Sequence, residues 1–432
     1  MKKIALAVAL ASISVAAHAT MDWVLDNTNN QVIRFVAETG EYRGTFGRGV
    51  IDAAGFPRGI CQSPVDGRVF ISIQNGASSS VKIFDPYTGA YGGVYASGFM
   101  AAPGSIAIAT DGKMYVTDLS TQRIYIFDTA TGAYGGVIGA GFGINKAVLN
   151  GDTLICTTST QILKFDRLTG ALTGILSGFG QSPSAVGVIS PTQYAFTGPG
   201  SPQPGILRFE ATAGTYQGSL ATNWFATITD FETMANGDML VLANSLNSIP
   251  LIARFVASTG QYKGLLGVGF PIGSSQDMAI EQPCSVSGNL IFQDYVGANR
   301  NLFVDVVDPV SGITLDSVTI PNSNTGPFTF KTVYRGTLDL YFNGSHWLRK
   351  KVGSVVIGAS GATGVNVSLV NGNCVYDSVI DLSDYTALVT AFNAVPASGN
   401  WNPEADVNGD NIVDLTDYTV VAVNFNALGD GP

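Results

Sequence analysis

The stretch ADVNGDNIVDLTDY, residues 405 to 418, has an acidic or amide side chain at every second or third position, in a chain where 12% of residues are charged. Ca²⁺ takes about six to eight oxygen ligands, and a loop with ligands at positions 1, 3, 5, 7, 9 and 12 wraps it. A solvated acidic surface run would not need this spacing. The sequence therefore predicts a calcium site formed by Asp406, Asn408, Asp410, Ile412, Asp414 and Asp417. Ile412, at position 7, would bind through its backbone carbonyl. Asn411 stands at position 6, where the chain bends sharply, and Asn tolerates the left-handed conformation.

The same block occurs 33 residues earlier, where DLSDYTALVTAF from 381 matches DLTDYTVVAVNF from 414. The ligand positions of this first loop are held by Asn373, Asp377, Val379 through its carbonyl, Asp381 and Asp384. Position 3 is Val375, whose side chain cannot bind a cation. We expect the first site to be weaker, incomplete or completed by water.

Apolar residues follow each loop at offsets of 3, 6, 7 and 10, which lie along one face of a helix. The two stripes are Leu382, Tyr385, Leu388, Val389 and Phe392, and Leu415, Tyr418, Val421, Ala422 and Phe425. We expect two loop-helix units that bury these stripes against each other. Their stability should depend on metal, because carboxylates gathered in one loop repel each other until a cation neutralises them.

This duplicated loop-helix arrangement, residues 371 to 432, resembles a type I dockerin. The resemblance implies bound calcium and a protein partner for the exposed face, which would be a cohesin-like or cell-envelope protein. In dockerins the residues at loop positions 10 and 11 contribute to cohesin recognition. Here they are Leu382-Ser383 and Leu415-Thr416 instead of the small polar pair of cellulosomal members.

One phrase recurs six times before residue 283: IRFVAETGEYRG, KIFDPYTGAYGG, YIFDTATGAYGG, LKFDRLTGALTG, LRFEATAGTYQG and ARFVASTGQYKG. In each, an apolar strand ends at a Phe and a polar turn is closed by a Gly, which takes a positive φ without steric cost. The Gly residues recur at about 44-residue spacing, as in propeller blades. They are Gly40, Gly89, Gly132, Gly170, Gly214 and Gly260.

The ends of this array predict a closed ring. Residues 23 to 35 match the second and third strands of the pattern but have no first strand before them, and DMAIEQP at 277 to 283 supplies it. Closure leaves no free sheet edge. We therefore predict a six-bladed β-propeller over residues 20–283. The unit resembles the NHL-type extracellular propellers. A near-match at 306, VVDPVSG, leaves seven blades as the alternative.

Residues 284 to 370 drop the Tyr-x-Gly and continue as evenly spaced alternating strands, which predicts a β-sandwich of about seven strands. This segment resembles Ig-like or carboxypeptidase-regulatory-like modules, with RGTLDLYFNGSHWLRKKV from 335 carrying the likeness. The resemblance implies a role in spacing or in weak binding. The fold class expected for the chain is thus mainly β, with a small α-helical tail.

The first 19 residues predict export, because Lys2 and Lys3 precede a short apolar run that ends in Ala17-His18-Ala19. We expect a bacterial protein that is secreted or held at the cell surface, with no membrane span, since no later apolar run is long enough. The net charge of −10 argues against a nucleic-acid partner. Four widely separated cysteines allow one or two disulfides without fixing a pairing.

Beyond the export segment the chain has a single histidine, His346, so imidazole-dependent nucleophilic catalysis is excluded from the propeller. We expect His346 to be partly buried beside Trp347. Carboxylate-pair chemistry needs no histidine, and its candidates are Asp26, Asp118, Asp230 and Glu232. Asp26 and Asp118 occupy equivalent places in their blades, which favours turn stabilisation.

Two functions follow. The first is a non-catalytic binding protein whose propeller presents a ligand or protein face and whose tail attaches it to a partner. The alternative is an extracellular polysaccharide-active enzyme, a glycoside hydrolase or lyase that carries a dockerin, with a glycan as its substrate.

Overall fold

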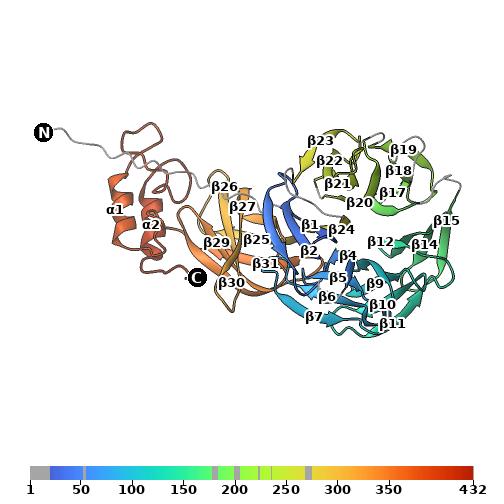
Figure 1. Ribbon diagram of the computed structural model, residues 1–432. Helices are drawn as coiled ribbons and strands as arrows, with labels where there is room; N and C mark the ends of the chain where they lie inside the picture. The colour runs from blue at the N-terminus through green and yellow to red at the C-terminus, as the bar shows by residue number, and fades with distance from the viewer. Residues whose placement is uncertain are drawn as a thin grey trace. The chain divides into compact units, whose positions relative to one another are not determined.

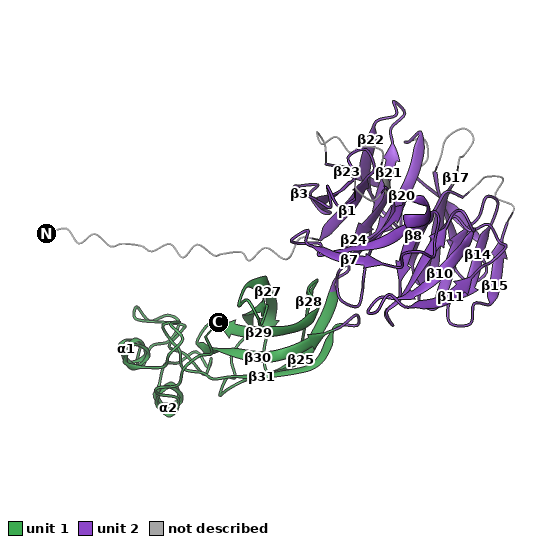
Figure 2. Ribbon diagram, turned by 60° about the horizontal axis from the view of Figure 1, so that its bottom comes forward, with its two compact units in different colours: residues 1–18, 284–357, 361–432 green, residues 19–283, 358–360 purple. Residues whose placement is uncertain are grey.

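The computed structural model describes residues 20–51, 55–177, 183–198, 205–221, 224–234, 236–267 and 275–431. The residues that predict export, 1 to 19, lie outside these ranges. The described chain is mainly β and forms two compact units, shown in two colours in Figure 2. The first unit is Ala19–Pro283 with Gly358–Ser360, and the second contains Cys284–Ile357 and Gly361–Pro432.

The described part of the first unit contains six four-stranded antiparallel sheets, which follow one another along the chain (Figure 1). Five of them use consecutive strands. They consist of β4 (Phe56–Gln62), β5 (Val69–Gln74), β6 (Ser80–Phe84) and β7 (Tyr91–Tyr95); β8 (Pro103–Ile108), β9 (Lys113–Asp118), β10 (Arg123–Asp128) and β11 (Tyr134–Ile138); β12 (Lys146–Asn150), β13 (Thr153–Thr157), β14 (Ile162–Asp166) and β15 (Leu172–Leu176); β16 (Ala185–Ser190), β17 (Gln193–Gly198), β18 (Gly205–Glu210) and β19 (Tyr216–Leu220); and β20 (Thr227–Thr233), β21 (Asp238–Asn244), β22 (Pro250–Val256) and β23 (Tyr262–Leu266). A short 3-10 helix, Gly76–Ser78, precedes β6.

The sixth sheet joins the two ends of this unit. Its strands are β24 (Ser275–Ile280), β1 (Met21–Asp26), β2 (Gln31–Val36) and β3 (Tyr42–Phe46), in that order. β24 pairs antiparallel with β1, with Trp23 opposite Ala279. The strand that the sequence assigned to the far end of the array is therefore the neighbour of β1, which confirms that prediction.

The repeated turn has the conformation expected from its glycines. In all six copies the shared Gly has a φ between 68° and 75°. Its N–H donates to the carbonyl four residues earlier over 2.7 to 3.0 Å. The Phe before each turn is buried, at Phe35, Phe84, Phe127, Phe165, Phe209 and Phe255. Six copies of one sequence phrase thus give six copies of one turn between the last two strands of each sheet.

Seven strands of the second unit form two sheets with a shared core. One sheet has the order β28 (Gly326–Thr332), β25 (Cys284–Phe292), β31 (Ala362–Leu369), in which β25 and β31 run parallel. The other has the order β27 (Thr314–Ser323), β26 (Arg300–Val307), β29 (Gly336–Gly344), β30 (Trp347–Ile357). The near-match at 306 lies at the end of β26, so it belongs to this unit.

The tail contains two helices, α1 (Leu382–Thr390) and α2 (Leu415–Val423), and packs in the same compact unit as these seven strands. The amide Nδ2 of buried Asn371 donates to the carbonyl oxygens of Gln293 (3.0 Å) and Val407 (2.6 Å). Leu348 of β30 joins the apolar core of the tail. Among the described residues, neither helix has the length needed to cross a membrane.

The prediction that the two apolar stripes bury each other is wrong for most of their residues. Leu388 and Val421 are buried, but the other eight are exposed: Leu382, Tyr385, Val389, Phe392, Leu415, Tyr418, Ala422 and Phe425. The buried side of each helix is the one that carries the last acidic residue of its loop, Asp384 or Asp417. Because that carboxylate must reach back into the loop, it turns the apolar stripe outward.

Candidate functional site

The second predicted calcium loop is wrapped around Asp406. The Asp406 carboxylate accepts backbone N–H groups from Gly409 (3.0 Å), Asp410 (3.1 Å) and Asn411 (3.0 Å). Asn411 has a φ of 70°, the left-handed conformation expected at position 6. The sequence thus anticipated the bend, and the bend brings three amides onto the side chain at position 1.

Asp417, at position 12, closes the same loop. One of its oxygens accepts the N–H of Asn408 at position 3 (3.1 Å), and the other accepts the N–H of Asp414 at position 9 (2.8 Å). Asp414 accepts the N–H of Thr416 (2.7 Å) and is the N-cap of α2, so the end of the loop is also the capping box of the helix. Asp410 accepts the N–H of Ile412 (2.9 Å). Loop and helix are therefore one local structure.

The first loop repeats this arrangement. Asp384 accepts N–H groups from Val375 (3.0 Å) and Asp381 (2.9 Å), and Asp381 is the N-cap of α1. Asn373 accepts the N–H of Asp377 (3.2 Å), and Asp377 accepts the N–H of Val379 (3.2 Å). The two loops differ at position 3, where the Val375 side chain is exposed and Asn408 is buried.

The electrostatics of the second loop fit an oxygen-ligated cation. Burial raises the pKa of Asp406, and Asp410 adds to the increase. Burial also raises the pKa of Asp417, with Asp406 and Asp410 contributing. Such repulsion is what a bound cation relieves. In the part of the chain that the structure describes, no three His, Cys, Asp or Glu side chains already converge as a metal site. The calcium sites therefore stay a prediction carried by the spacing and by the loop geometry.

A second candidate region lies in the first unit, where the structure separates the four carboxylate candidates. Asp26 accepts N–H groups from Thr28 (3.0 Å) and Asn29 (3.3 Å). Asp118 accepts N–H groups from Ser120 and Thr121, each at 2.8 Å. These two acids stabilise turns, which confirms the interpretation drawn from their equivalent positions.

Asp230 belongs to a buried ion cluster that joins three sheets. The Lys146 ammonium, from β12, contacts Asp230 of β20 and Asp277 of β24, the latter at 2.7 Å. Each acid gives its second oxygen to a backbone N–H, Asp230 to Met278 (3.0 Å) and Asp277 to Ile60 (2.9 Å). Burial alone would lower the pKa of Lys146, but the two carboxylates outweigh it and hold that pKa above its usual value.

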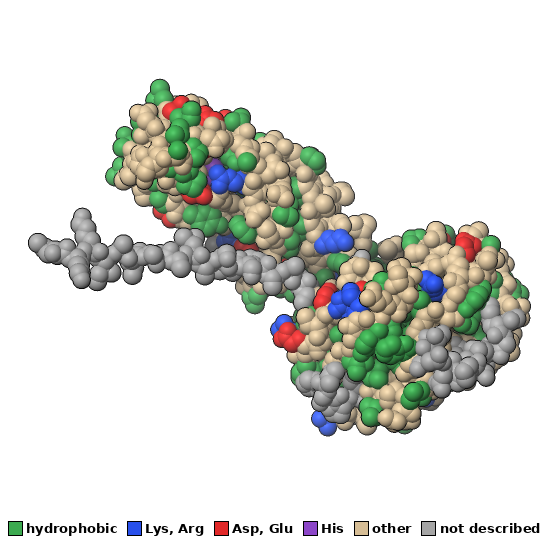
Figure 3. Space-filling model, turned by 90° about the horizontal axis from the view of Figure 1, so that it is seen from above, with side chains coloured by type: hydrophobic (Ala, Val, Ile, Leu, Met, Phe, Trp, Pro, Cys, Tyr) green, Lys and Arg blue, Asp and Glu red, His purple; other side chains and the backbone are tan. Residues whose placement is uncertain are grey.

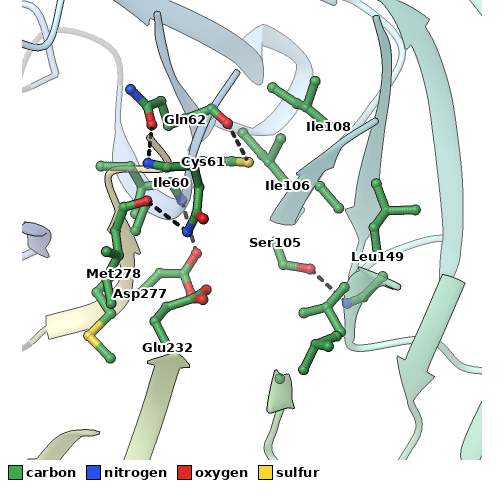
Figure 4. Close-up of a pocket in the computed structure, with 18 of the residues that line it drawn as sticks. Ile60, Cys61, Gln62, Ser105, Ile106, Ile108, Leu149, Glu232, Asp277 and Met278 are labelled. Atoms are coloured by element: carbon green, nitrogen blue, oxygen red, sulfur yellow. Dashed lines mark hydrogen bonds between the residues drawn. The ribbon is translucent and has the colours of Figure 1, made fainter. Parts of the chain in front are cut away.

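Glu232 lies two residues beyond Asp230 and lines a pocket of about 350 Å³ together with Lys146 and Asp277. Figure 4 shows Glu232 and Asp277 side by side at this pocket. Burial raises the pKa of Glu232 to about 7, with Lys146 opposing the shift and Asp277 adding to it. The described residues give the Glu232 carboxylate no hydrogen bond. Asp277 and Lys146 were not singled out from the sequence, in which nothing marks two such residues as neighbours.

Asp22 of β1 is fully buried, and within the described chain neither of its oxygens has a hydrogen-bond partner. Burial, and then Glu232, raises its pKa to about 8. A group whose folded-state pKa is raised makes its contribution to stability at low pH, and this is lost as the pH rises through the folded pKa. Asp22 therefore makes the first unit less stable in mildly alkaline solution.

We predict that Asp22→Asn removes this pH dependence. In the wild-type chain the free energy of unfolding should fall by roughly 1 kcal/mol per pH unit between about pH 5 and 8 through Asp22 alone. Urea unfolding at a series of pH values measures the slope. Asp152→Asn, which changes an exposed acid of the same unit, should keep the wild-type slope. Equal slopes in Asp22→Asn and wild type would contradict the assignment.

His346 is fully buried, so the expectation of partial burial is wrong, although its ring does lie beside Trp347 with centroids 4.4 Å apart. Burial, with Arg300 second, lowers its pKa to about 3. The reason is that its ring packs against Tyr295, with centroids 5.6 Å apart, as well as against Trp347, and both belong to the shared core of the two sheets. The four cysteines, all described, are free thiols.

No model of a known protein family matches the chain, and no curated protein matches it. Among solved structures, a nidogen/laminin complex is 12% identical over 60% of this chain and 98% of that chain, with a TM-score of 0.47. Kuenenia stuttgartiensis hydrazine synthase is 15% identical over 69% and 76%, with a TM-score of 0.41. A type II cohesin–X-dockerin complex from Acetivibrio cellulolyticus is 20% identical over 34% and 97%, with a TM-score of 0.28. These likenesses are too distant to assign a family.

Proposed function

We propose that this is an exported, non-catalytic binding protein. In this proposal the six sheets are the blades of a six-bladed propeller, the seven strands are an Ig-like sandwich, and residues 371–432 are a calcium-dependent docking module. The observation that carries the proposal is the duplicated tail. Each of the two loops is closed by an Asp at position 12 that also completes the capping box of the following helix, and both helices turn most of their apolar stripe to solvent.

The exposed stripes form a surface, which we call the apolar helix face. It consists of Leu382, Tyr385, Val389 and Phe392 of the first stripe and Leu415, Tyr418 and Phe425 of the second. The rings of Tyr385 and Tyr418 meet at 5.9 Å between centroids, so the two stripes are continuous. Apolar side chains are visible on the surface of the second unit in Figure 3. An exposed patch of this kind is typical of a protein-binding site.

A hollow borders this face. About 450 Å³ in volume, it is lined by Leu415, Thr416, Thr419, Val420 and Val423 of α2 with Asp294 and Asn408. Leu415 and Thr416 are the residues at loop positions 10 and 11, the positions that the dockerin resemblance links to partner recognition. The segment 371–432 has nine Asp and Glu and no Lys or Arg. We therefore expect a protein partner with an apolar centre and a basic rim.

Calcium would act on this surface through the loops. Asp384 and Asp417 each hold a loop and the first turn of a helix together, so a cation bound at either loop fixes the start of that helix. Leu382 and Leu415 are the first residues of α1 and α2, and each is 66% exposed. Metal binding and partner binding should therefore be coupled.

The alternative, a polysaccharide-active enzyme, rests on Asp230 and Glu232, which lie on one strand beside a pocket. A carboxylate pair needs two groups free to act on substrate. Both oxygens of Asp230 are engaged, one by Lys146 and one by the N–H of Met278. This arrangement favours binding over glycoside cleavage. Glycan breakdown by the wild-type chain that disappears in Glu232→Ala would favour the enzyme over the binding protein.

The docking proposal is tested by biolayer interferometry with the immobilised full chain and a panel of cohesin modules, in calcium and in EGTA. We expect at least one module to bind in calcium only, and the double variant Leu382→Asp, Leu415→Asp to reduce that binding by about a hundredfold. Leu168→Asp changes an equally exposed leucine of the first unit and should bind normally. Binding that persists in EGTA, or that the double variant retains, would contradict the proposal.

A further inference from the structure

The pocket beside Glu232 has features that the ion cluster alone does not account for. Lys146 contacts one oxygen of Asp230 and one of Asp277, and the second oxygen of each acid accepts a backbone N–H. Both oxygens of each aspartate therefore already have a partner. Glu232 adds a further carboxylate that lines the open volume. Lys146 is the one cation of the cluster, and among the described residues Glu232 is the acid of the cluster that makes no hydrogen bond.

The apolar walls of the pocket are aliphatic, and they lie beside polar lining residues such as Gln62, Ser105 and Thr233. The apolar walls include Ile60, Ile106, Ile108, Leu149, Val188 and Ile280, which come from five different strands (Figure 4). None of the described lining residues is aromatic. A flat ring would therefore find no stacking partner here, and a quaternary ammonium group would find no aromatic cage. The walls fit a short saturated chain, and the volume is within the range of small-ligand pockets.

An inorganic cation fits less well. The Lys146 ammonium already occupies the space between the two aspartates, so a metal ion could not take both of them as ligands together with Glu232. In the described chain no three acidic, His or Cys side chains converge as a metal site. An ammonium group on an alkyl chain needs only one free carboxylate and an apolar channel, because its three N–H donors can also reach neutral acceptors.

We propose that this pocket binds a small primary alkylammonium compound, with the ammonium group on Glu232 and the alkyl chain along the isoleucine side chains. Gln62 and Ser105 also line the pocket. Gln62 Oε1 accepts the N–H of Gln282 (3.0 Å) and Ser105 Oγ accepts the N–H of Ala147 (2.9 Å), so each oxygen has one further lone pair for a ligand. The proposal rests on the proposed role of the propeller as a ligand-binding body. It does not depend on the tail, so the cohesin experiment can fail without affecting it, and the reverse also holds.

The test is isothermal titration calorimetry of the full chain with three probes of matched shape: n-butylammonium, n-butanol and n-butyrate. We expect n-butylammonium to bind at one site, and the alcohol and the carboxylate to bind at least about tenfold more weakly. Because this comparison uses the wild-type chain, it needs no variant to fold. Equal affinities for the three probes, or no binding of n-butylammonium, would overturn the proposal.

Two variants locate the site. Glu232→Gln keeps the shape of the side chain and should lower the affinity for n-butylammonium about tenfold. Glu41→Gln, an exposed acid of the same unit, should leave it unchanged. Circular dichroism checks that each variant is folded. Unchanged affinity in Glu232→Gln would overturn the proposal, and so would displacement of n-butylammonium by millimolar Mg²⁺, which would identify an inorganic cation as the occupant.

Discussion

Replacing Asp417 by Ala should destabilise the second unit much more in calcium than in EGTA, whereas the equivalent change of Asp384 should show a smaller difference. The two residues are matched. Both are fully buried at position 12, and each accepts the N–H groups of positions 3 and 9. Their loops differ at position 3, which is Val375 in the first and Asn408 in the second.

The matched pair separates the structural loss from the loss of metal. In EGTA both variants lose two charge-assisted hydrogen bonds and the capping box of a helix, which should cost about 2–4 kcal/mol in each case. In calcium Asp417→Ala should cost about 3 kcal/mol more, the linkage expected when free calcium is about a hundred times its Kd. In calcium, Asp384→Ala should show a smaller additional loss of stability, because the first loop has Val375 at position 3.

Differential scanning calorimetry of the full chain measures this. The transition that shifts with calcium in the wild-type chain identifies the second unit. If Asp417→Ala and Asp384→Ala shift that transition equally, and by the same amount with and without calcium, the second loop is not the stronger metal site. The calcium interpretation of the 405–418 stretch would then lose its main support.

Lys146→Met should be the most damaging single change in the first unit. It removes the one cation that contacts both Asp230 and Asp277, and it leaves two acids in a buried environment. Removal of one partner from a buried ion pair costs about 3–5 kcal/mol, because the remaining charge is no longer compensated. Lys113→Met, which removes an exposed partner of Asp128, should cost less than about 1 kcal/mol.

The loss in Lys146→Met should shrink as the pH falls. Burial raises the folded-state pKa of Asp230, Lys146 opposes this increase, and removal of the ammonium should raise that pKa further above its unfolded value. The folded chain then binds protons that the unfolded chain releases, so its stability increases towards acid and is lost as the pH rises. Urea unfolding at pH 5 and pH 8 measures the difference. If Lys146→Met loses the same free energy of unfolding at pH 5 and at pH 8, the aspartates are not left buried and charged.

The sequence could predict the repeated sheets because their rules are local. Each turn between the last two strands of a sheet needs a positive φ at one position, and a Gly stands there in all six copies. The pairing of β24 with β1 was also predictable, since the first strand of the array was missing from one end and present at the other.

The failures arise where a polar group overrides the apolar pattern. The stripes of α1 and α2 have helical spacing, but each helix is oriented by the carboxylate that closes its loop, so the stripes face solvent. The ion cluster could not be predicted, because Lys146 is 84 residues from Asp230 and 131 from Asp277. Only closure of the sheets around a common centre brings the three together. The sequence identified Glu232 as a candidate acid, but it did not identify Lys146 and Asp277, which contribute to the pKa of Glu232.

The central claim, that the alternating carboxylates of the tail enclose calcium, is tested most directly by calorimetric titration of Ca²⁺ into the metal-free full chain. The account predicts a tight binding event lost in Asp417→Ala, a weaker one lost in Asp384→Ala, and a rise in the melting temperature of the second unit as the first event saturates. A wild-type chain that releases no heat, and melts at the same temperature in millimolar calcium and in EGTA, would contradict it.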